Sequence, residues 1–462
     1  MDNKLTRKIP NMNSLLERKE FEGIERERVK RAARAYLDAL RDDIVSGRLS
    51  QAPDADACVR GILAVMDGEQ REGMRGVINA TGIVLHTNLG RAPLGEELYK
   101  AVRRIYSGYG SLEYDVESGE RGSRCAQVEK LVCELSGAEA AMAVNNNAAA
   151  VFLILSELAK GKKAAISRGE LVEIGGSFRI PEIMAQSGAE LVEVGCTNKT
   201  RLGDYEAALD AGAELLMKVH TSNYTITGFS GSVSPKELSA LARERGVPLI
   251  YDMGSCFVSD PELLGIKGGH TAREGIESGA DVICFSGDKL AGSAQAGIIA
   301  GRAEYISRMK KNPLARVVRP DKLTISALEQ TLKLCRYPET ARKSVPVLEM
   351  LSRSAEELGR QAEELAEKIR AAAPLWEIGI CPTEDEAGGG SLPGTEFPGW
   401  AVSIEPKGMT LREFEEGMRL APTPIVLRLH DSKALISPRT LMPEDGDEIA
   451  ARIRELYSRI SP

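Results

Sequence analysis

The sequence lacks several features that would each define a class of protein. It has no apolar run approaching the roughly 18–20 residues that span a bilayer, which excludes a membrane-spanning helix. No Cys-x-x-Cys pair occurs among its eight cysteines, and a chain of 462 residues needs no disulfide framework, so we expect free thiols. The four histidines show no metal-ligand spacing with cysteines, and we therefore expect no metal site. No apolar signal segment follows the first residues, which predicts a cytoplasmic protein.

The chain as a whole also lacks an excess of positive charge. It carries 60 basic and 67 acidic side chains, which argues against a surface that coats nucleic acid indiscriminately. The first fifty residues have the opposite sign, with twelve basic and nine acidic residues. Apolar residues recur there at helical spacing, so residues 24–44 should form an amphipathic helix with a basic outer face. Both an ordinary solvated helix and an RNA-binding helix fit this pattern.

From about residue 71 the chain alternates between short apolar runs and helical stretches. Apolar runs without strict alternation are typical of strands that are buried on both faces. The expected fold class is therefore α/β, with a mostly parallel sheet covered by helices. The strand-like runs are residues 141–144, 164–167, 189–194, 215–220, 248–252, 282–285 and 297–300.

The same patterns suggest three domains. We expect a helical domain at residues 1–70, a large α/β domain at 71–337 and a small α/β domain at 338–462. In the last of these, apolar residues at helical spacing from Leu348 to Ile369 predict one long helix that Pro374 stops. A glycine-rich loop at 388–394 follows, and then two strands at 400–404 and 425–429 that flank a helix at 411–420.

The sharpest chemical feature is Lys289, which follows the apolar run that ends at Phe285. A buried lysine tends to have a lowered pKa, which makes its amine available as a nucleophile or a base, although a lysine in an exposed turn fits this local motif too. Asp252 ends another apolar run, and residues 145–150 offer backbone N–H groups for a phosphate at the start of a helix. A lysine, a carboxylate for a ring nitrogen and a phosphate site together indicate pyridoxal phosphate.

Six stretches of the sequence resemble those of bacterial selenocysteine synthases, the L-seryl-tRNA(Sec) selenium transferase family. They are residues 75–94, 112–124, 167–180, 218–224, 388–393 and 439–441. The resemblance covers nearly the whole chain, including the basic head. The chain departs from the family pattern at Ser293 and Ala294, after the lysine, and at Cys256, after Asp252. Neither departure removes a group that the chemistry needs.

The resemblance implies a fold-type-I pyridoxal phosphate transferase that assembles as a homo-oligomer built from dimers, for example a decamer. It implies that Lys289 binds the cofactor, that Asp288 takes part in catalysis, and that Arg91, Arg316 and Arg319 hold the phosphate of selenophosphate. Guanidinium groups match phosphate oxygens bidentately, in agreement with this assignment. The residues that we assign to cofactor binding are Asn146, Asn147, Ala148, His220, Asp252, Ser286 and Lys289.

The expected function is conversion of seryl-tRNA(Sec) to selenocysteinyl-tRNA(Sec), with selenophosphate as donor, by β-elimination to an aminoacrylyl intermediate and addition of selenium. One alternative is a pyridoxal phosphate lyase that acts on a small amino acid or amino sugar, which needs neither the basic head nor the donor arginines. Another is a tRNA-binding protein with an inactive cofactor site.

For each of four further arginines, the sequence allows two interpretations. Arg121 and Arg124 belong either to the active site or to salt bridges with Glu117 and Glu120, and exposed pairs of that kind contribute little to stability. Arg428 and Arg439, in the small domain, bind either the substrate or local acids. The sequence leaves these choices open.

Overall fold

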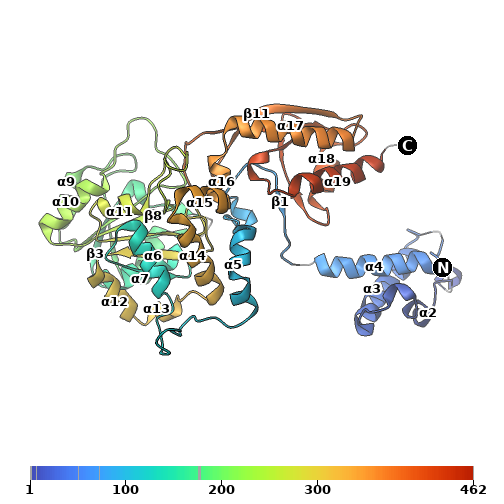
Figure 1. Ribbon diagram of the computed structural model, residues 1–462, viewed down its shortest axis with the longest axis horizontal. Coiled ribbons are helices and arrows are strands. Elements are labelled where there is room, and N and C mark those ends of the chain that lie inside the picture. Colours follow the sequence, from blue (N-terminus) through green and yellow to red (C-terminus); the bar gives the residue numbers. More distant parts are fainter. Residues whose placement is uncertain (1–2, 7, 50, 72, 175–177, 461–462) are drawn as a thin grey trace. The chain divides into compact units, whose positions relative to one another are not determined.

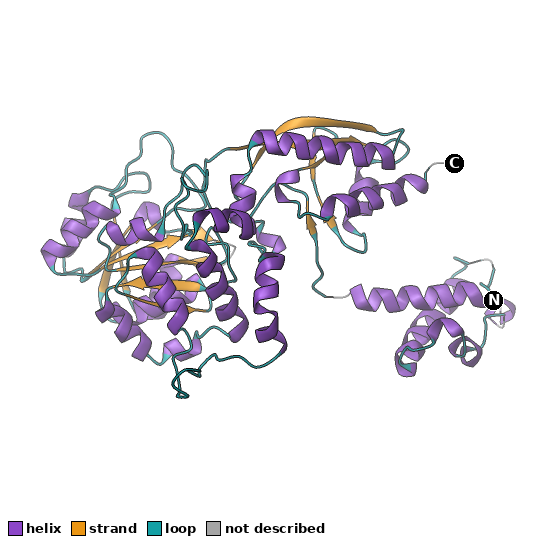
Figure 2. Cartoon of the chain, in the orientation of Figure 1, coloured by secondary structure: helices purple, strands orange, loops and turns teal. Residues whose placement is uncertain are grey.

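The computed structural model describes residues 3–6, 8–49, 51–71, 73–174 and 178–460 (Figure 1, Figure 2). Gly175, Gly176 and Ser177, in one of the stretches that carry the resemblance, lie outside the described residues. The chain forms two compact units, Met1–Val77 with Leu420–Pro424 and Ile78–Arg419 with Ile425–Pro462. Of the two predicted α/β domains, 71–337 and 338–462, all but residues 71–77 and 420–424 fall within the second unit. No helix in the described ranges is both long and apolar enough to cross a membrane.

The first unit contains the predicted basic helix. It spans Arg26–Val45 where residues 24–44 were expected, and its apolar stripe, including Val29, Leu37 and Ile44, packs against the apolar face of the next helix. Periodicity alone was enough here because one face of the helix is buried and the other is solvated. The helices of this unit are α1 (Asn3–Thr6), α2 (Met12–Leu16), η1 (Lys19–Phe21), α3 (Arg26–Val45) and α4 (Ala55–Arg71).

A seven-stranded sheet forms the centre of the second unit, in the order β2-β10-β9-β8-β7-β3-β6. The pairs among β9, β8, β7, β3 and β6 are parallel, whereas β10 is antiparallel to both β9 and β2. The prediction of a mostly parallel sheet is therefore confirmed. The strands are β2 (Ala140–Val144), β3 (Lys163–Ser167), β6 (Glu190–Val194), β7 (Leu215–Val219), β8 (Leu249–Gly254), β9 (Val282–Ser286) and β10 (Gly297–Gly301), which correspond to the seven predicted runs.

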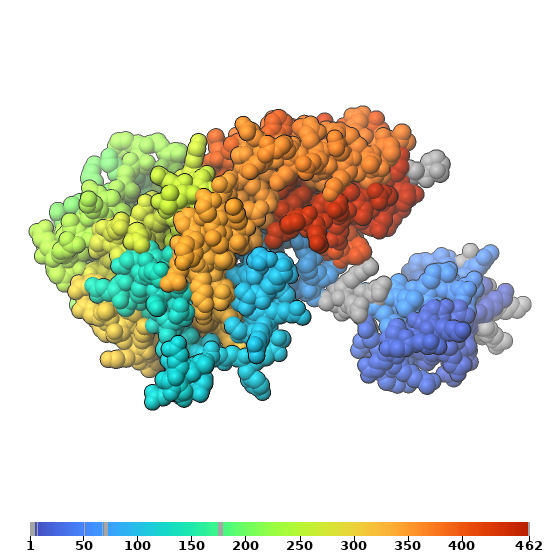
Figure 3. All heavy atoms as spheres, viewed as in Figure 1, coloured from blue at the N-terminus to red at the C-terminus, as the bar shows by residue number. Residues whose placement is uncertain are grey.

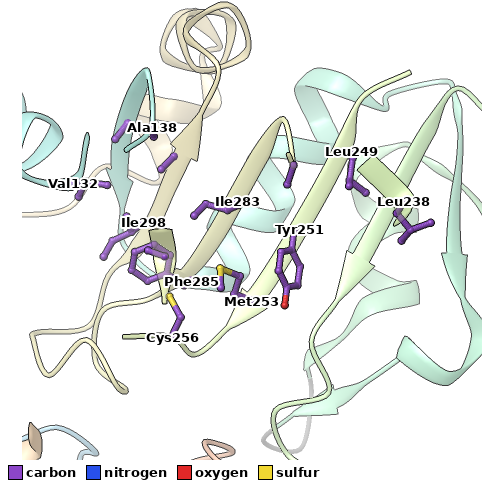
Figure 4. Close-up of a cluster of buried hydrophobic side chains, with 14 of the residues drawn as sticks. Val132, Ala138, Leu238, Leu249, Tyr251, Met253, Cys256, Ile283, Phe285 and Ile298 are labelled. Atoms are coloured by element: carbon purple, nitrogen blue, oxygen red, sulfur yellow. The ribbon is translucent and has the colours of Figure 1, made fainter. Parts of the chain in front are cut away.

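Helices cover both faces of this sheet, because successive side chains of a strand point to opposite faces. On β9, Ile283 and Phe285 join one buried cluster and Val282 and Cys284 join the other. The first cluster, part of which is drawn in Figure 4, includes residues of α6, α9, α10, α11 and α14. The second includes residues of α7, α8 and α12.

The helices of the sheet domain lie before, between and after its strands in the sequence. They are α5 (Gly95–Ser107), α6 (Ala126–Ser136), α7 (Asn147–Leu158), α8 (Ile180–Ser187), α9 (Leu202–Asp210), α10 (Pro235–Arg245), α11 (Ala272–Glu277), α12 (Ala303–Lys311), α13 (Leu314–Val317), α14 (Lys322–Cys335) and α15 (Pro338–Ser344), with the short η2 (Thr87–Leu89) and η3 (Arg168–Glu170). Two small two-stranded sheets complete it. These sheets pair β1 (Ile78–Asn79) with β13 (Ile425–Val426), and β4 (Glu173–Ile174) with β5 (Phe178–Arg179).

The C-terminal part is a four-stranded antiparallel sheet in the order β11-β12-β15-β14, packed against helices. In the space-filling view it is continuous with the sheet domain (Figure 3). The first strand was not predicted, because its sequence contains Gly379 and Pro382 and most of its residues are only partly buried. The elements are α16 (Pro346–Ser352), α17 (Ala355–Ala372), β11 (Glu377–Asp385), β12 (Phe397–Glu405), α18 (Leu411–Arg419), β14 (Arg428–His430), β15 (Lys433–Ile436), η4 (Pro438–Thr440) and α19 (Asp445–Ser458).

The prediction of one long helix from Leu348 to Ile369 is wrong. The chain is extended at Arg353, and two helices, α16 and α17, replace the single one. Ser354 starts the second helix with a capping box, in which its side chain accepts from the Glu357 N–H and the Glu357 carboxylate accepts from the Ser354 N–H. This local capping signal outweighs an apolar spacing that continues across the break.

Candidate active site

The candidate site lies at the carboxyl ends of three neighbouring parallel strands. His220 follows β7, Asp252 lies near the end of β8, and Lys289 follows β9 by three residues. Parallel strands present their carboxyl ends at one edge of a sheet, which is where ligands bind in folds of this kind. The sheet therefore brings together three of the residues that the sequence singled out.

Lys289 is buried, with 4% of its surface exposed. Burial is the main cause that lowers the pKa of its amine, and the positive charge of Arg91 lowers it further, while Asp252 and Asp288 oppose the change. A lowered pKa raises the share of the neutral amine, which is the form that reacts with a carbonyl group. The exposed-turn interpretation of this lysine is therefore wrong.

Asp252 is a buried carboxylate that is held through one of its two oxygens. Its Oδ1 accepts from the side-chain amide of Asn147 and from the backbone N–H of Gly254, both at 2.9 Å, and the Cys284 Sγ lies 3.6 Å away. Burial raises the pKa of Asp252, and the bond from Asn147 is the largest of the opposing causes. A buried carboxylate with one oxygen left over fits the protonated ring nitrogen of pyridoxal phosphate.

The start of α7 has the features that the predicted phosphate site requires. The Asn146 side chain caps the helix by accepting from the Ala149 N–H at 2.8 Å, and the first turn contains no acidic residue. The N–H groups of Asn147 and Ala148 have no acceptor within the helix and are available to an anion. Gly297 on β10 permits this geometry, because a Cβ at that position would lie 2.2 Å from the Asn146 carbonyl oxygen.

His220 is a largely buried imidazole beside these groups. Its backbone N–H donates to the Asp252 carbonyl at 2.8 Å, and its ring meets the His270 ring edge to face at 5.1 Å. Burial lowers the pKa of His220 to about 4, and the charges of His270, Lys218 and Lys289 act in the same direction. A neutral imidazole at this edge could stack on an aromatic cofactor ring. Ser286 is buried at the end of β9, opposite Gly297.

Arg91 reaches the residue next to the lysine. Its guanidinium lies 2.7 Å from the carboxylate of Asp288, a residue that is only 7% exposed. The Ala92 N–H also donates to the Asp288 backbone carbonyl. Arg91 has a φ of +64°, which is uncommon for a residue other than glycine. The turn after η2 that requires this conformation directs Arg91 toward the site.

The other two predicted donor arginines lie elsewhere in the chain. Arg316 is exposed on α13, and Arg319 lies beyond the end of that helix, so the two do not share a helical turn. The Arg319 guanidinium lies 3.5 Å from Glu113, and among the described residues no contact between either arginine and Arg91 is found. The backbone nevertheless links this segment to the phosphate site, because the Asn145 N–H donates to the Val318 carbonyl at 2.9 Å.

Glu113 is also the ion-pair partner of Arg121 and Arg124, two arginines whose partners the sequence left open. Arg121 and Arg124 lie 3.1 Å and 2.7 Å from its carboxylate, so they pair with Glu113 rather than with Glu117 or Glu120. These guanidinium groups lower the pKa of Glu113, with the Arg124 hydrogen bond as the largest cause. Three arginines, including Arg319, thus share one carboxylate and leave an excess of positive charge.

Arg428 and Arg439 bind a local acid, as one of their two interpretations expected. The fully buried Arg439 donates to Asp385 at 2.9 Å, and Arg428 approaches the other oxygen of the same carboxylate at 3.3 Å. Arg439 also donates to three backbone carbonyls, so it ties α16 to the C-terminal sheet. The sequence did not indicate Asp385, because β11 was not predicted.

A cavity of about 690 Å³ lies beside His220, although neither Lys289 nor Asp252 lines it. Its wall includes the buried ion pair between Lys218 and Glu170, which the sequence did not reveal.

Two buried polar atoms at the site have no partner among the described residues, the Ser222 Oγ and the Asn147 Oδ1. Unpaired buried polar atoms are costly, so their presence supports the fit of a polar cofactor. No group of three or more potential metal ligands is found in the described ranges.

The parallel sheet, the buried lysine, the buried carboxylate and the capped helix define a pyridoxal phosphate enzyme. A family model for L-seryl-tRNA selenium transferase matches residues 77–442. The L-seryl-tRNA(Sec) selenium transferase of Geobacter sulfurreducens is 44% identical over 457 residues, which cover 98% of this chain and 99% of the relative. That of Moorella thermoacetica is 45% identical, with 96% of each chain covered.

The chain belongs to the L-seryl-tRNA selenium transferase family. The predicted family, enzyme class and cofactor, pyridoxal phosphate, are thereby confirmed. Among solved structures, that of D-glucosaminate-6-phosphate ammonia-lyase is similar, with a TM-score of 0.58, 20% identity and coverage of 85% of this chain and 98% of the other. At that identity the likeness concerns the fold alone.

Proposed function

We propose that this enzyme converts seryl-tRNA(Sec) to selenocysteinyl-tRNA(Sec), with selenophosphate as the selenium donor. Family membership supports the reaction, and the observation that carries the site assignment is the shared sheet edge. There a buried amine, a buried carboxylate and an arginine beside the amine lie together. We further propose that the enzyme works in the cytoplasm as a homo-oligomer built from dimers.

When bound, pyridoxal phosphate supplies an electron sink for negative charge that develops at the substrate α-carbon. Its phosphate would be held by the N–H groups of Asn147 and Ala148, with Asn146 as the cap of that helix. Asp252 would hold the proton on the ring nitrogen, and His220 and Ser286 would border the ring. All of these groups come from the edge of one sheet and the helix beside it.

Lys289 carries the proton transfers in this proposal. Its amine has a lowered pKa, so a larger share of it is neutral and can accept the proton from the serine α-carbon. Lys289 then gives this proton to the serine hydroxyl, which leaves the β-carbon as water. The selenium of selenophosphate adds to the β-carbon, and Lys289 passes to the α-carbon the proton that the donor brings. Water cleaves the bond between selenium and phosphorus, which releases phosphate and leaves the selenol on the β-carbon. Asp288 is buried beside the amine and fixes the guanidinium of Arg91 at this point.

The donor site needs a cluster of positive charge, since selenophosphate is a small anion. Arg91 is held 2.7 Å from Asp288 and directed at the site. Arg319 and Arg316 lie in a basic segment, residues 308–322, that contains six basic residues and one acidic residue. The bond between Asn145 and Val318 joins that segment to the phosphate loop, which supports a role of both arginines in donor binding.

The basic face of α3 is the proposed contact for tRNA. Arg28, Lys30, Arg31 and Arg34 line a hollow of about 510 Å³ on this helix, together with two glutamates. Lysine and arginine side chains bind phosphates and release counterions, so tRNA binding should weaken as the salt concentration rises. A lyase for small substrates would not require this surface.

The decisive experiment is incubation of the purified enzyme with seryl-tRNA(Sec) and selenophosphate, followed by identification of the amino acid on the tRNA. We expect selenocysteine. Lys289→Ala should lose both the visible absorbance of the cofactor and the product, whereas Lys236→Ala, at an exposed lysine of α10, should keep both. Unchanged seryl-tRNA(Sec) together with breakdown of free amino acids would instead identify a small-substrate lyase.

A further inference from the structure

The two oxygens of Asp252 have different environments. Oδ1 accepts from the Asn147 Nδ2 and from the Gly254 N–H at 2.9 Å each, with the Cys284 Sγ at 3.6 Å. No hydrogen bond to Oδ2 is found in the part of the chain that the structure describes. Because Gly254 contributes a backbone group and a thiol is a weak donor, Asn147 is the strong side-chain donor of this set.

The fold places Asn147 and Asp252 together although 105 residues separate them in sequence. Asp252 occupies the face of β8 that also carries Ile250, and Cys284 is its register partner on β9. That face packs against α7, of which Asn147 is the first residue. A side chain at the start of α7 therefore reaches the carboxylate at the end of β8.

Asn147 thus has two different contacts to offer. Its backbone N–H belongs to the helix start that suits the cofactor phosphate, whereas its side chain is turned to Asp252. The carboxylate decides which end of the amide faces it, because the amide oxygen there would repel Oδ1 while the NH₂ group donates. The amide oxygen is left buried without a partner among the described residues, so the amide is held by its contact with Asp252.

We propose that Asn147 is a positioning residue, whose amide keeps Asp252 ionised and turns its Oδ2 toward the ring nitrogen of the cofactor. The proposal rests on pyridoxal phosphate as the cofactor and not on the selenium transfer reaction. Loss of the amide would leave Oδ1 with a backbone donor and a thiol, so the carboxylate would turn more freely. The proton on the ring nitrogen would then be lost at lower pH.

Two variants of similar side-chain volume test this role. Asn147→Leu removes the donor and keeps the volume, and it leaves the backbone N–H groups for the phosphate in place. The holoenzymes are reconstituted with pyridoxal phosphate labelled with ¹⁵N in the ring, and the ¹⁵N chemical shift is followed against pH. We expect the ring nitrogen of Asn147→Leu to lose its proton at lower pH than that of the wild type, and kcat to fall about tenfold to hundredfold.

Asn147→Asp distinguishes hydrogen bonding from packing. Two carboxylates in contact share one proton, so at low pH the new side chain donates to Asp252 as the amide does. As the pH rises that proton leaves and the donor is lost. At low pH the kcat of Asn147→Asp should therefore approach that of the wild type and fall away from it as the pH rises. The kcat of Asn147→Leu should stay below the wild-type value even at low pH, because leucine offers no donor at any pH and the carboxylate of Asp252 stays free to turn.

Asn312→Leu is the matched control for the ¹⁵N measurement. The Asn312 Nδ2 donates to the Glu157 carboxylate at 2.9 Å near the other end of α7, so the control removes the same kind of bond from the same helix. Its ¹⁵N titration should match that of the wild type. An Asn147→Leu titration that overlaps the wild-type curve would overturn the proposal, as would parallel pH profiles of the two Asn147 variants. The ¹⁵N measurement requires no tRNA, so its outcome is independent of the proposed reaction.

Discussion

Burial changes the pKa values of Lys289 and Asp252 in opposite directions. It favours the neutral amine at Lys289 and the neutral acid at Asp252, because a buried charge loses its hydration. A neutral amine is what the proposed reaction requires. Asp252 must instead be ionised to hold the proton on the ring nitrogen, and the hydrogen bond from Asn147 favours this charged form against the effect of burial.

His220 provides a test of burial at the residue scale. Its pKa is lowered from 6.5 to about 4, so between these values the unfolded chain takes up a proton that the folded chain does not. The free energy of unfolding should therefore decrease as the pH falls from about 6.5 to about 4, by at most about 3 kcal/mol from this residue. Urea unfolding of the cofactor-free protein at several pH values measures it.

His220→Asn should show a smaller loss of stability over that pH range than the wild type. His430→Asn is the matched control, since it removes an exposed histidine and retains His220, and it should keep the wild-type loss. If His220→Asn and the wild type lost stability in parallel, the burial of this imidazole would not be the cause.

At the scale of elements, the hypothesis that Arg316 and Arg319 bind the selenium donor depends on the turn that joins α13 to α14. Val318 accepts from the Asn145 N–H at 2.9 Å, and this bond keeps Arg319 one residue from the phosphate loop. Glu113 restrains the Arg319 guanidinium but is shared with Arg121 and Arg124. One carboxylate cannot neutralise three guanidinium groups, so an anion would be attracted there.

Arg319→Ala should therefore raise the KM for selenophosphate about tenfold to hundredfold, as expected when a charged hydrogen bond is lost. The visible absorbance of the cofactor should not change, because Arg319 contacts none of the residues proposed to hold it. Steady-state kinetics at varied selenophosphate concentration measures the effect. Arg245→Ala, which removes an arginine of α10 that pairs with Asp210 of α9, should leave the KM unchanged. Equal KM values for the two variants would exclude the donor role of Arg319.

At the scale of the whole molecule, charge is distributed unevenly between the parts of the chain. The net charge is −7, yet the first fifty residues carry more basic than acidic side chains. An acidic enzyme with a basic helical unit suits one specific tRNA better than nucleic acid in general. Removal of residues 1–70 should therefore abolish selenocysteine formation and leave the visible absorbance of the cofactor in place.

A milder change tests the same surface without a deletion. Arg26→Glu with Arg34→Glu, at exposed positions of α3, should weaken tRNA binding and reduce its dependence on salt, as measured by filter binding at several salt concentrations. Arg360→Glu with Arg370→Glu, at exposed positions of α17, makes the same change of charge elsewhere and should have a smaller effect. Equal losses for both pairs would indicate a response to net charge rather than to a tRNA contact.

Local patterns in the sequence were enough to predict all seven strands of the main sheet, α3, and the positions of Lys289, Asp252 and His220 at strand ends. These predictions were correct because a strand buried on both faces needs a continuous apolar run, and a helix buried on one face needs apolar residues at helical spacing. The break at Arg353 was missed because the apolar spacing continues across the capping box that starts the second helix. The strand β11 was missed because most of its residues are only partly buried, so its sequence shows no apolar run.

Only the tertiary structure decided which side chains meet. Asn147 bonds to Asp252, Arg319 approaches Glu113, and Arg439 is buried against Asp385, across 105, 206 and 54 residues of sequence respectively. Such pairs depend on strand register and on the position of each helix against the sheet, which no local pattern records. The sequence by itself therefore determined the family and the chemical groups, and the packing of distant elements determined how those groups are held.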